Sequence, residues 1–166
     1  MSERGLPVLV IQAHAYRTGA EVGVWRGDRA WAILDGTAVE SLMLVDPWIE
    51  ELNRFRTTER VPDRMVPGRY HCTMGEPHQT QHDLNQMALA VSMKALAYGE
   101  RAKVYRLRSE EMLPMLVPHS LDFVCLDGIH LWPWIEAQSE RWLTKIRPGG
   151  MLMLDTPEGG FRQHPA

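Results

Sequence analysis

Short apolar runs alternate with helical patterns along this chain, and the alternation restricts the fold more than any other feature of the sequence. Turn or charged residues bound each run, as is typical of strands; the runs are AEVGV, SLMLV, KVYRL, LDFVCL and GMLML. Between and after them, helices are expected over residues 27–35, 80–98, 110–116 and 131–145. This order predicts an α/β fold in which helices cover both faces of a parallel sheet.

Local signals mark where the later elements begin and end. Ser109 stands before two glutamates and is expected to cap the helix over 110–116. The run Arg147-Pro148-Gly149-Gly150 is expected to stop the helix over 131–145. Residues 49–79 form a long excursion, which we expect to lie at the substrate cleft because long connections in compact domains are usually functional or disordered.

Length and composition limit the class of protein. The 166 residues suit a single domain over 1–166. No apolar stretch is long enough for a transmembrane helix and the N-terminal apolar patch is too short for a signal peptide, so a cytoplasmic protein is expected. The net charge of -3 gives no support for nucleic-acid binding. Cys125 lies inside an apolar strand, which disfavours a structural disulfide with Cys72.

The stretch GAEVGVWRG lies at the end of the first predicted strand. In a parallel α/β sheet, ligands bind beyond the carboxyl ends of the strands. Glu21, Gly23 and Gly27 are spaced E-x-G-x-x-x-G, whereas a dinucleotide fingerprint is G-x-G-x-x-G. Trp25 and Arg26 stand where a pyrophosphate needs little side chain, so a smaller nucleoside ligand is favoured. A tight strand-to-helix turn with no ligand remains the alternative.

Acidic residues follow three other predicted strands. Asp46 comes about twenty residues after the glycines, where an acid can accept hydrogen bonds from ribose hydroxyls; the alternative is a helix cap before Pro47. Asp127 and Asp155 end neighbouring strands and can share a divalent cation, or can simply be solvated. His130 can act as a base at neutral pH, or can be a hydrogen-bonded structural residue.

Taken together, four ordered motifs resemble the class I S-adenosylmethionine-dependent methyltransferases, in particular the small-molecule O-methyltransferase-like group with a methyltransferase domain of type 24. The motifs are GAEVGVWRG at 19–27, LVDPW at 44–48, SLDFVCLDGIH at 120–130 and RPGGML at 147–152. The resemblance covers about residues 18–155. It implies a Rossmann-like, doubly wound sheet of about five parallel strands in the order 3-2-1-4-5, within a three-layer α/β/α domain.

The resemblance also implies roles for the residues at the strand ends. Those near the methionine and ribose parts of S-adenosylmethionine are Glu21, Gly23, Gly27 and, at the ribose, Asp46. Arg108 and Ser109 are implied near adenine, and Asp127 near the methyl donor. In the metal-dependent members, acids at the positions of Asp127 and Asp155 bind Mg²⁺. Thr156 stands where those members carry a third ligand, and its hydroxyl is a weaker one.

The C-terminal tail departs from the resemblance. The family fold ends in an antiparallel hairpin, but only TPEGGFRQHPA follows Asp155, and this tail is expected to be too short and too rich in Gly and Pro to pair with the sheet. The sheet would then end at about five strands with an exposed edge, which a homodimer could cover.

The leading hypothesis is a methyltransferase that moves a methyl group to a hydroxyl or other nucleophile of a small or glycosylated substrate, with Asp127 and His130 as catalytic residues. The alternative is a non-catalytic S-adenosylmethionine-binding or assembly module of the same fold. A dinucleotide-dependent oxidoreductase ranks third, because Trp25 and Arg26 crowd the loop.

Overall fold

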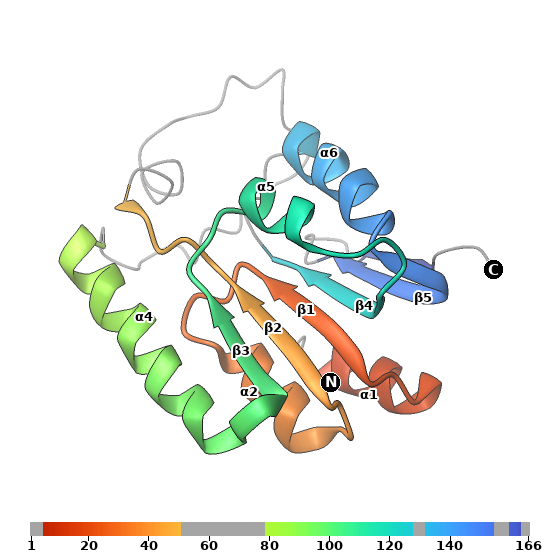
Figure 1. The fold of residues 1–166 in the computed structure, drawn as a ribbon, viewed down its shortest axis with the longest axis horizontal. Coiled ribbons are helices and arrows are strands. Elements are labelled where there is room, and N and C mark those ends of the chain that lie inside the picture. The colour runs from red at the N-terminus through yellow and green to blue at the C-terminus, as the bar shows by residue number, and fades with distance from the viewer. Residues whose placement is uncertain (1–4, 51–78, 128–131, 155–159, 164–166) are drawn as a thin grey trace.

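The computed structural model describes residues 5–50, 79–127, 132–154 and 160–163. The described strands form one sheet in the order β3-β2-β1-β4-β5-β6 (Figure 1). Their bounds are β1 (Thr18–Val22), β2 (Ser41–Val45), β3 (Ala102–Tyr105), β4 (Leu121–Leu126), β5 (Ile146–Leu154) and β6 (Gly160–Gln163). The first five strands run parallel, which confirms the expected order 3-2-1-4-5.

Helices cover both faces of the sheet, as the alternation predicts. They are α1 (Gly5–His14), α2 (Asp28–Gly36), α4 (Gln81–Ala95), α5 (Ser109–Met112) and α6 (Trp132–Leu143), with 3-10 turns η1 (Leu96–Arg101) and η2 (Leu113–Met115). One apolar cluster joins α1, α2 and α4 to the sheet, and a second joins α5 and α6 to its other face. From Phe123 to Leu126, successive β4 residues alternate between the two clusters, as the pleat of a strand requires.

The tail prediction is wrong. β6 pairs antiparallel with β5, with Leu154 opposite Gly160 and Met151 opposite Gln163. Four residues of this short tail pair with the edge strand, despite its Gly-rich composition. β5 is therefore covered on its outer side, which removes the reason given above for a homodimer at that edge.

Other boundaries differ from the expected ones in informative ways. β1 ends at Val22, so Gly23 lies in the loop and not in the strand. The last helix ends at Leu143, and Arg147-Pro148-Gly149-Gly150 lies inside β5, where the pairing with β4 shifts register. The N-terminal apolar patch forms α1, a helix that was not predicted from the sequence pattern. None of the helices within the described ranges is both long and apolar enough to span a bilayer.

Candidate active site

The glycine loop between β1 and α2 is a tight turn held by backbone hydrogen bonds. The N–H of Gly23 donates to the carbonyl of Val45 at 2.9 Å, and that of Gly27 to the carbonyl of Val24 at 2.8 Å. Gly27 is the N-cap of α2 and has a φ of 79°; a Cβ there would lie 2.6 Å from the Trp31 ring. Glycine is therefore required at this position by both conformation and space.

Asp46 anchors this loop to the end of β2. Its Oδ2 accepts the backbone N–H of Trp25 at 2.9 Å, and its Oδ1 accepts that of Trp48 at 2.8 Å. The Trp48 indole N–H donates to the carbonyl of Trp25 at 3.0 Å. Both tryptophans have positive φ, 54° and 46°, a conformation that needs such support. The bond to Trp48, two residues on, is an Asx turn, which differs from the helix-cap alternative.

The carboxyl group of Glu21 is buried at the end of β1, where the residue is 1% exposed. Its neighbours in the strand face α5 and α6, so Glu21 points to the opposite face, where α2 begins. Burial raises its pKa to about 8; Arg29 lowers the pKa, while Asp127, Asp46 and Asp28 raise it. The Oε2 atom has no hydrogen-bond partner in the described part of the chain. At pH 7 Glu21 is thus a buried neutral acid with an unused polar atom.

An ion pair joins the start of α2 to the end of β4. Nη2 of Arg29 lies 3.1 Å from Oδ2 of Asp127, and their side chains are 14% and 26% exposed. The Asp127 N–H donates to the carbonyl of Val22 at 2.8 Å, which fixes Asp127 beside the glycine loop. Arg29 lies outside the sequence motifs and was not predicted as a site residue. Its place in the first turn of a helix could have indicated a nearby acid, because a cation there opposes the helix dipole unless an acid lies near it.

Arg106, which follows β3, forms hydrogen bonds with the segment after Asp46 and with α4. Its Nε donates to the carbonyl of Pro47 at 3.3 Å, and its Nη2 contacts Asn85 of α4. Gln81, at the start of α4, donates to the carbonyl of Trp48 at 2.9 Å. The end of β2 is therefore held by residues that come much later in the sequence.

The two residues implied near adenine lie at the start of α5. Arg108 is the N-cap, and its N–H donates to Oε2 of Glu111 at 2.7 Å, so the prediction that Ser109 caps this helix is wrong. The buried Ser109 hydroxyl donates to Gln138 at 2.6 Å and accepts from the Trp142 indole at 2.8 Å. Ser109 thereby ties α5 to α6, because a buried hydroxyl must be satisfied locally. Contact of either residue with adenine stays a prediction.

Several predicted site residues lie outside the described residues. They are His130, Asp155, Thr156 and most of the excursion, residues 51–78. Within the described ranges, no three His, Cys, Asp or Glu side chains come together as a metal site would require. Asp127 is paired with a guanidinium, which places a positive charge where a cation would bind. The described residues therefore do not fit a Mg²⁺ site, and the metal prediction rests on the sequence alone.

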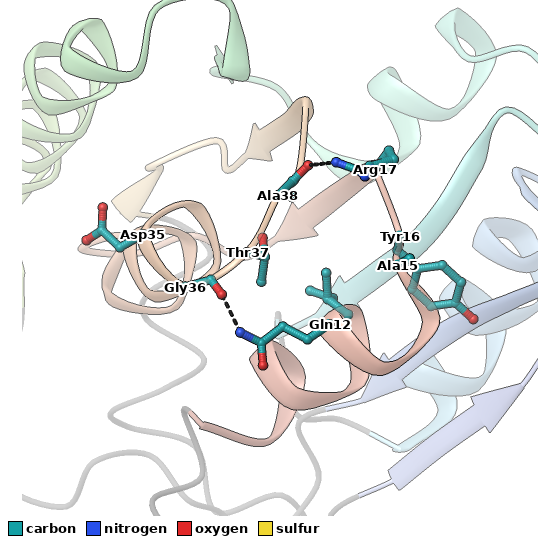
Figure 2. Close-up of a pocket in the computed structure, with 9 residues that line it drawn as sticks. Gln12, Ala15, Tyr16, Arg17, Asp35, Gly36, Thr37 and Ala38 are labelled. Atoms are coloured by element: carbon teal, nitrogen blue, oxygen red, sulfur yellow. Dashed lines mark hydrogen bonds between the residues drawn. The ribbon is translucent and has the colours of Figure 1, made fainter.

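A hollow of about 410 Å³ lies at the opposite, amino end of β1 and β2 (Figure 2). Its polar groups bond one another: Gln12 donates to the Gly36 carbonyl at 2.6 Å, and Arg17 to the Ala38 carbonyl at 2.9 Å. These side chains satisfy carbonyls at and after the end of α2, as helix ends require. We read this hollow as structural, and the strand carboxyl ends as the candidate site.

Similarity to known proteins indicates the family and the fold of the chain. A sequence model of a methyltransferase domain matches residues 20–156. No curated protein matches the sequence. Among solved structures, the O-methyltransferase TomG from Streptomyces achromogenes, involved in tomaymycin synthesis and solved with S-adenosylmethionine, has a TM-score of 0.60 at 14% identity, over 92% of this chain and 54% of that chain.

Two further solved structures show the same likeness. The O-methyltransferase from Bacillus cereus, solved with S-adenosylhomocysteine, has a TM-score of 0.60 at 14% identity, over 92% of this chain and 54% of that chain. A third structure is the 1,6-didemethyltoxoflavin-N1-methyltransferase from Burkholderia thailandensis, solved with 1,6-didemethyltoxoflavin and S-adenosylhomocysteine. It has a TM-score of 0.53 at 14% identity, over 92% of this chain and 51% of that chain. At these identities the likeness shows the fold, and the chain spans about half the length of these proteins.

Proposed function

The chain belongs to the methyltransferase domain family, and from this premise we propose that it transfers the methyl group of S-adenosylmethionine to a hydroxyl or other nucleophile of a small or glycosylated molecule. The observation that carries the proposal is the convergence of Glu21, Asp46, Asp127 and Arg29 on one glycine loop. A cluster of titratable groups at strand ends, one of them with a strongly raised pKa, is typical of binding sites in α/β folds.

A nucleoside that carries an amino-acid group fits the described residues. The unpartnered Oε2 of Glu21 offers a buried hydrogen-bond site beside the loop, near the proposed methionine and ribose groups. A carboxylate can accept about four hydrogen bonds, so Asp46 can hold ribose hydroxyls while it keeps Trp25 and Trp48 in place. Gly23 and Gly27 let the backbone approach the ligand closely. Arg108 and Ser109 are proposed at the adenine end.

The proposed chemistry is an in-line displacement at the methyl carbon. S-adenosylmethionine supplies a methyl group on a sulfonium, which is already a good leaving group. The protein has to align the acceptor oxygen with that methyl group and accept one proton. Asp127 is the described residue that we propose beside the methyl donor, and His130 is proposed as the base. No step is assigned to a metal.

Calorimetric titration of S-adenosylhomocysteine, with and without Mg²⁺, tests the proposal. We expect micromolar binding that does not depend on Mg²⁺. The variant Asp46→Asn removes the negative charge and one of the two oxygens that accept the N–H groups of Trp25 and Trp48. It should bind at least about tenfold more weakly, because a charge-assisted hydrogen bond to the ligand and one anchor of the loop are both lost. No binding at millimolar ligand would contradict the proposal. Binding without transfer to a panel of small hydroxyl and glycosylated acceptors would favour the non-catalytic alternative.

Localisation, oligomeric state and the role of the excursion are separate proposals. We propose a cytoplasmic protein that acts on a small molecule, with the excursion 49–79 contributing to the acceptor site. Because β6 covers β5, a homodimer through the sheet edge would have to use β6 or β3, the two outermost strands of the described sheet. Sedimentation velocity at several protein concentrations would distinguish a dimer from a monomer.

A further inference from the structure

We propose that Arg29 binds the carboxylate of the cofactor's amino-acid group, and that this carboxylate replaces Asp127 as the partner of the guanidinium. The proposal rests on the proposed function, since it assigns a residue to S-adenosylmethionine. It concerns a side chain that none of the sequence motifs named above includes.

The position of Arg29 is the first argument. It lies in the first turn of α2, directly after the glycine loop, and its side chain is 14% exposed. No side chain caps the start of α2, because the N-cap is Gly27. The first N–H groups of a helix and a guanidinium together form a favourable site for an anion.

The buried acid beside Arg29 is an independent indication of a ligand. Glu21 is 1% exposed, and its Oε2 has no partner among the residues that the structure describes. The charge of Arg29 lowers the pKa of Glu21, which burial raises, so the two side chains are near enough to interact electrostatically. A buried polar atom without a partner is costly, and a bound ligand with a polar group would satisfy it.

The charges around the loop select the kind of ligand. The positive charge of Arg29 lowers the pKa of Glu21, whereas the negative charges of three acids, Asp127, Asp46 and Asp28, raise it. A multiply charged anion such as a phosphate would meet these carboxylates and be repelled. An amino-acid zwitterion carries one carboxylate and one ammonium, which can face Arg29 and Asp127 respectively. Separating the ion pair around a zwitterion leaves each partner with an opposite charge, whereas a singly charged ligand would leave one of them unpaired.

Two ligands that differ in one group test this assignment. S-adenosylmethionine and its decarboxylated form share the adenosine, the sulfonium and the amine, and differ in the carboxylate. Calorimetry with the wild-type protein should give tighter binding of S-adenosylmethionine, by about 10- to 100-fold for one charge-assisted bidentate contact. The substitution Arg29→Gln should remove most of that difference, while it changes binding of the decarboxylated ligand by less than about threefold.

Further variants keep the test decisive. Arg29→Lys retains the charge without the planar fork and should give an intermediate loss, even if Arg29→Gln proves too unstable to study. Arg141→Gln removes an exposed arginine of α6 and serves as the matched control, which should bind both ligands as the wild type does. Thermal unfolding of each variant checks that it is folded.

The outcomes separate this inference from the proposed function. In one outcome, the wild-type protein binds both ligands while Arg29→Gln weakens the binding of both equally or leaves both unchanged. In that case the assignment of Arg29 is wrong and the cofactor assignment stands. If the wild-type protein binds neither ligand at millimolar concentration, the proposed function and this inference both fail.

Discussion

At the scale of single residues, the candidate site depends on acids that have different tasks. Asp46 uses both carboxylate oxygens on backbone N–H groups, Asp127 pairs with Arg29, and Glu21 is buried with one oxygen unused. Three acids that look equivalent in the sequence are therefore a loop anchor, an ion-pair partner and a neutral group. Burial and neighbouring charges make the difference.

Glu21 should make the stability of the protein fall as pH rises. Burial raises its folded-state pKa from 4.5 to about 8, so between these values the folded state holds a proton that the unfolded state has lost. Stability from this group is complete below pH 4.5 and decreases towards pH 8, with a slope of at most about 1.4 kcal/mol per pH unit. Urea unfolding at several pH values should show the slope in wild type and not in Glu21→Gln.

The exposed Glu40, whose side chain is 71% exposed, provides the control for this measurement. Glu40→Gln should leave the pH dependence of the wild type unchanged. Stability curves of Glu21→Gln and wild type that run parallel between pH 5 and 8 would show that Glu21 is ionised in the folded protein.

At the scale of elements, the start of α2 depends on Gly27, whose positive φ turns the chain from the loop into the helix. We expect Gly27→Ala to destabilise the protein by about 2–4 kcal/mol, since it combines a left-handed φ with a clash against the Trp31 ring. Gly99 has a φ of 58° and a ψ of -134°, which side chains rarely adopt, but no atom lies within 4 Å of its missing Cβ. Gly99→Ala should therefore show the backbone cost alone, about 1–3 kcal/mol. A loss in Gly27→Ala that is no larger than the loss in Gly99→Ala would argue against the clash.

The contact of α5 with α6 depends on one buried hydroxyl. Ser109→Ala leaves Gln138 and the Trp142 indole short of a partner, and should destabilise the protein by about 1–3 kcal/mol. Ser92 offers a comparison, because its hydroxyl bonds the Ala88 carbonyl on a half-buried helix face and Ser92→Ala should be nearly neutral. Equal effects of the two substitutions, measured by chemical denaturation, would mean that the buried network contributes little.

At the scale of the whole molecule, Asp122 holds three strands together at the amino end of the sheet. Its Oδ2 accepts the N–H of Arg17 at 2.6 Å and of Thr18 at 2.8 Å, and its Oδ1 accepts from Arg147 of β5. Burial raises the pKa of Asp122, but the hydrogen bonds from Arg147 and the two backbone groups outweigh burial and lower it. The amino end is thus fixed by charge, while the carboxyl end holds the candidate site.

The variant Asp122→Asn should lower the melting temperature at pH 7, because it removes the charge that binds Arg147 and two backbone N–H groups. The cost should be about 1–3 kcal/mol, since the Arg147 side chain is 47% exposed and solvent screens its ion pair. A lowered pKa contributes stability that is lost as pH falls, so wild type and variant should converge below pH 3.8, the ordinary value for this group. Calorimetric melting at pH 7 and pH 3 checks both statements. A difference that persists undiminished at pH 3 would contradict the ionic account.

The sequence by itself determined the order of the five parallel strands and the place of the candidate site. Apolar runs with turn residues between them specify strands and helices through local physics, and parallel pairing then brings the strand ends, with Glu21, Asp46 and Asp127, to one edge. Gly27 was identifiable for the same reason, since a tight turn needs glycine.

Only the tertiary structure decided what those residues contact. Arg29 meets Asp127 and Arg106 meets Pro47 across long separations in the chain, and no local pattern encodes such pairs. β6 forms because the edge strand β5 has unpaired backbone N–H and C=O groups with which the tail can pair. The composition of the tail does not reveal this pairing. The Ser109 hydroxyl does not cap the helix but bonds Gln138 and the Trp142 indole in a buried network. An unpaired polar group costs more free energy when it is buried than when it is exposed, so the buried partners take precedence.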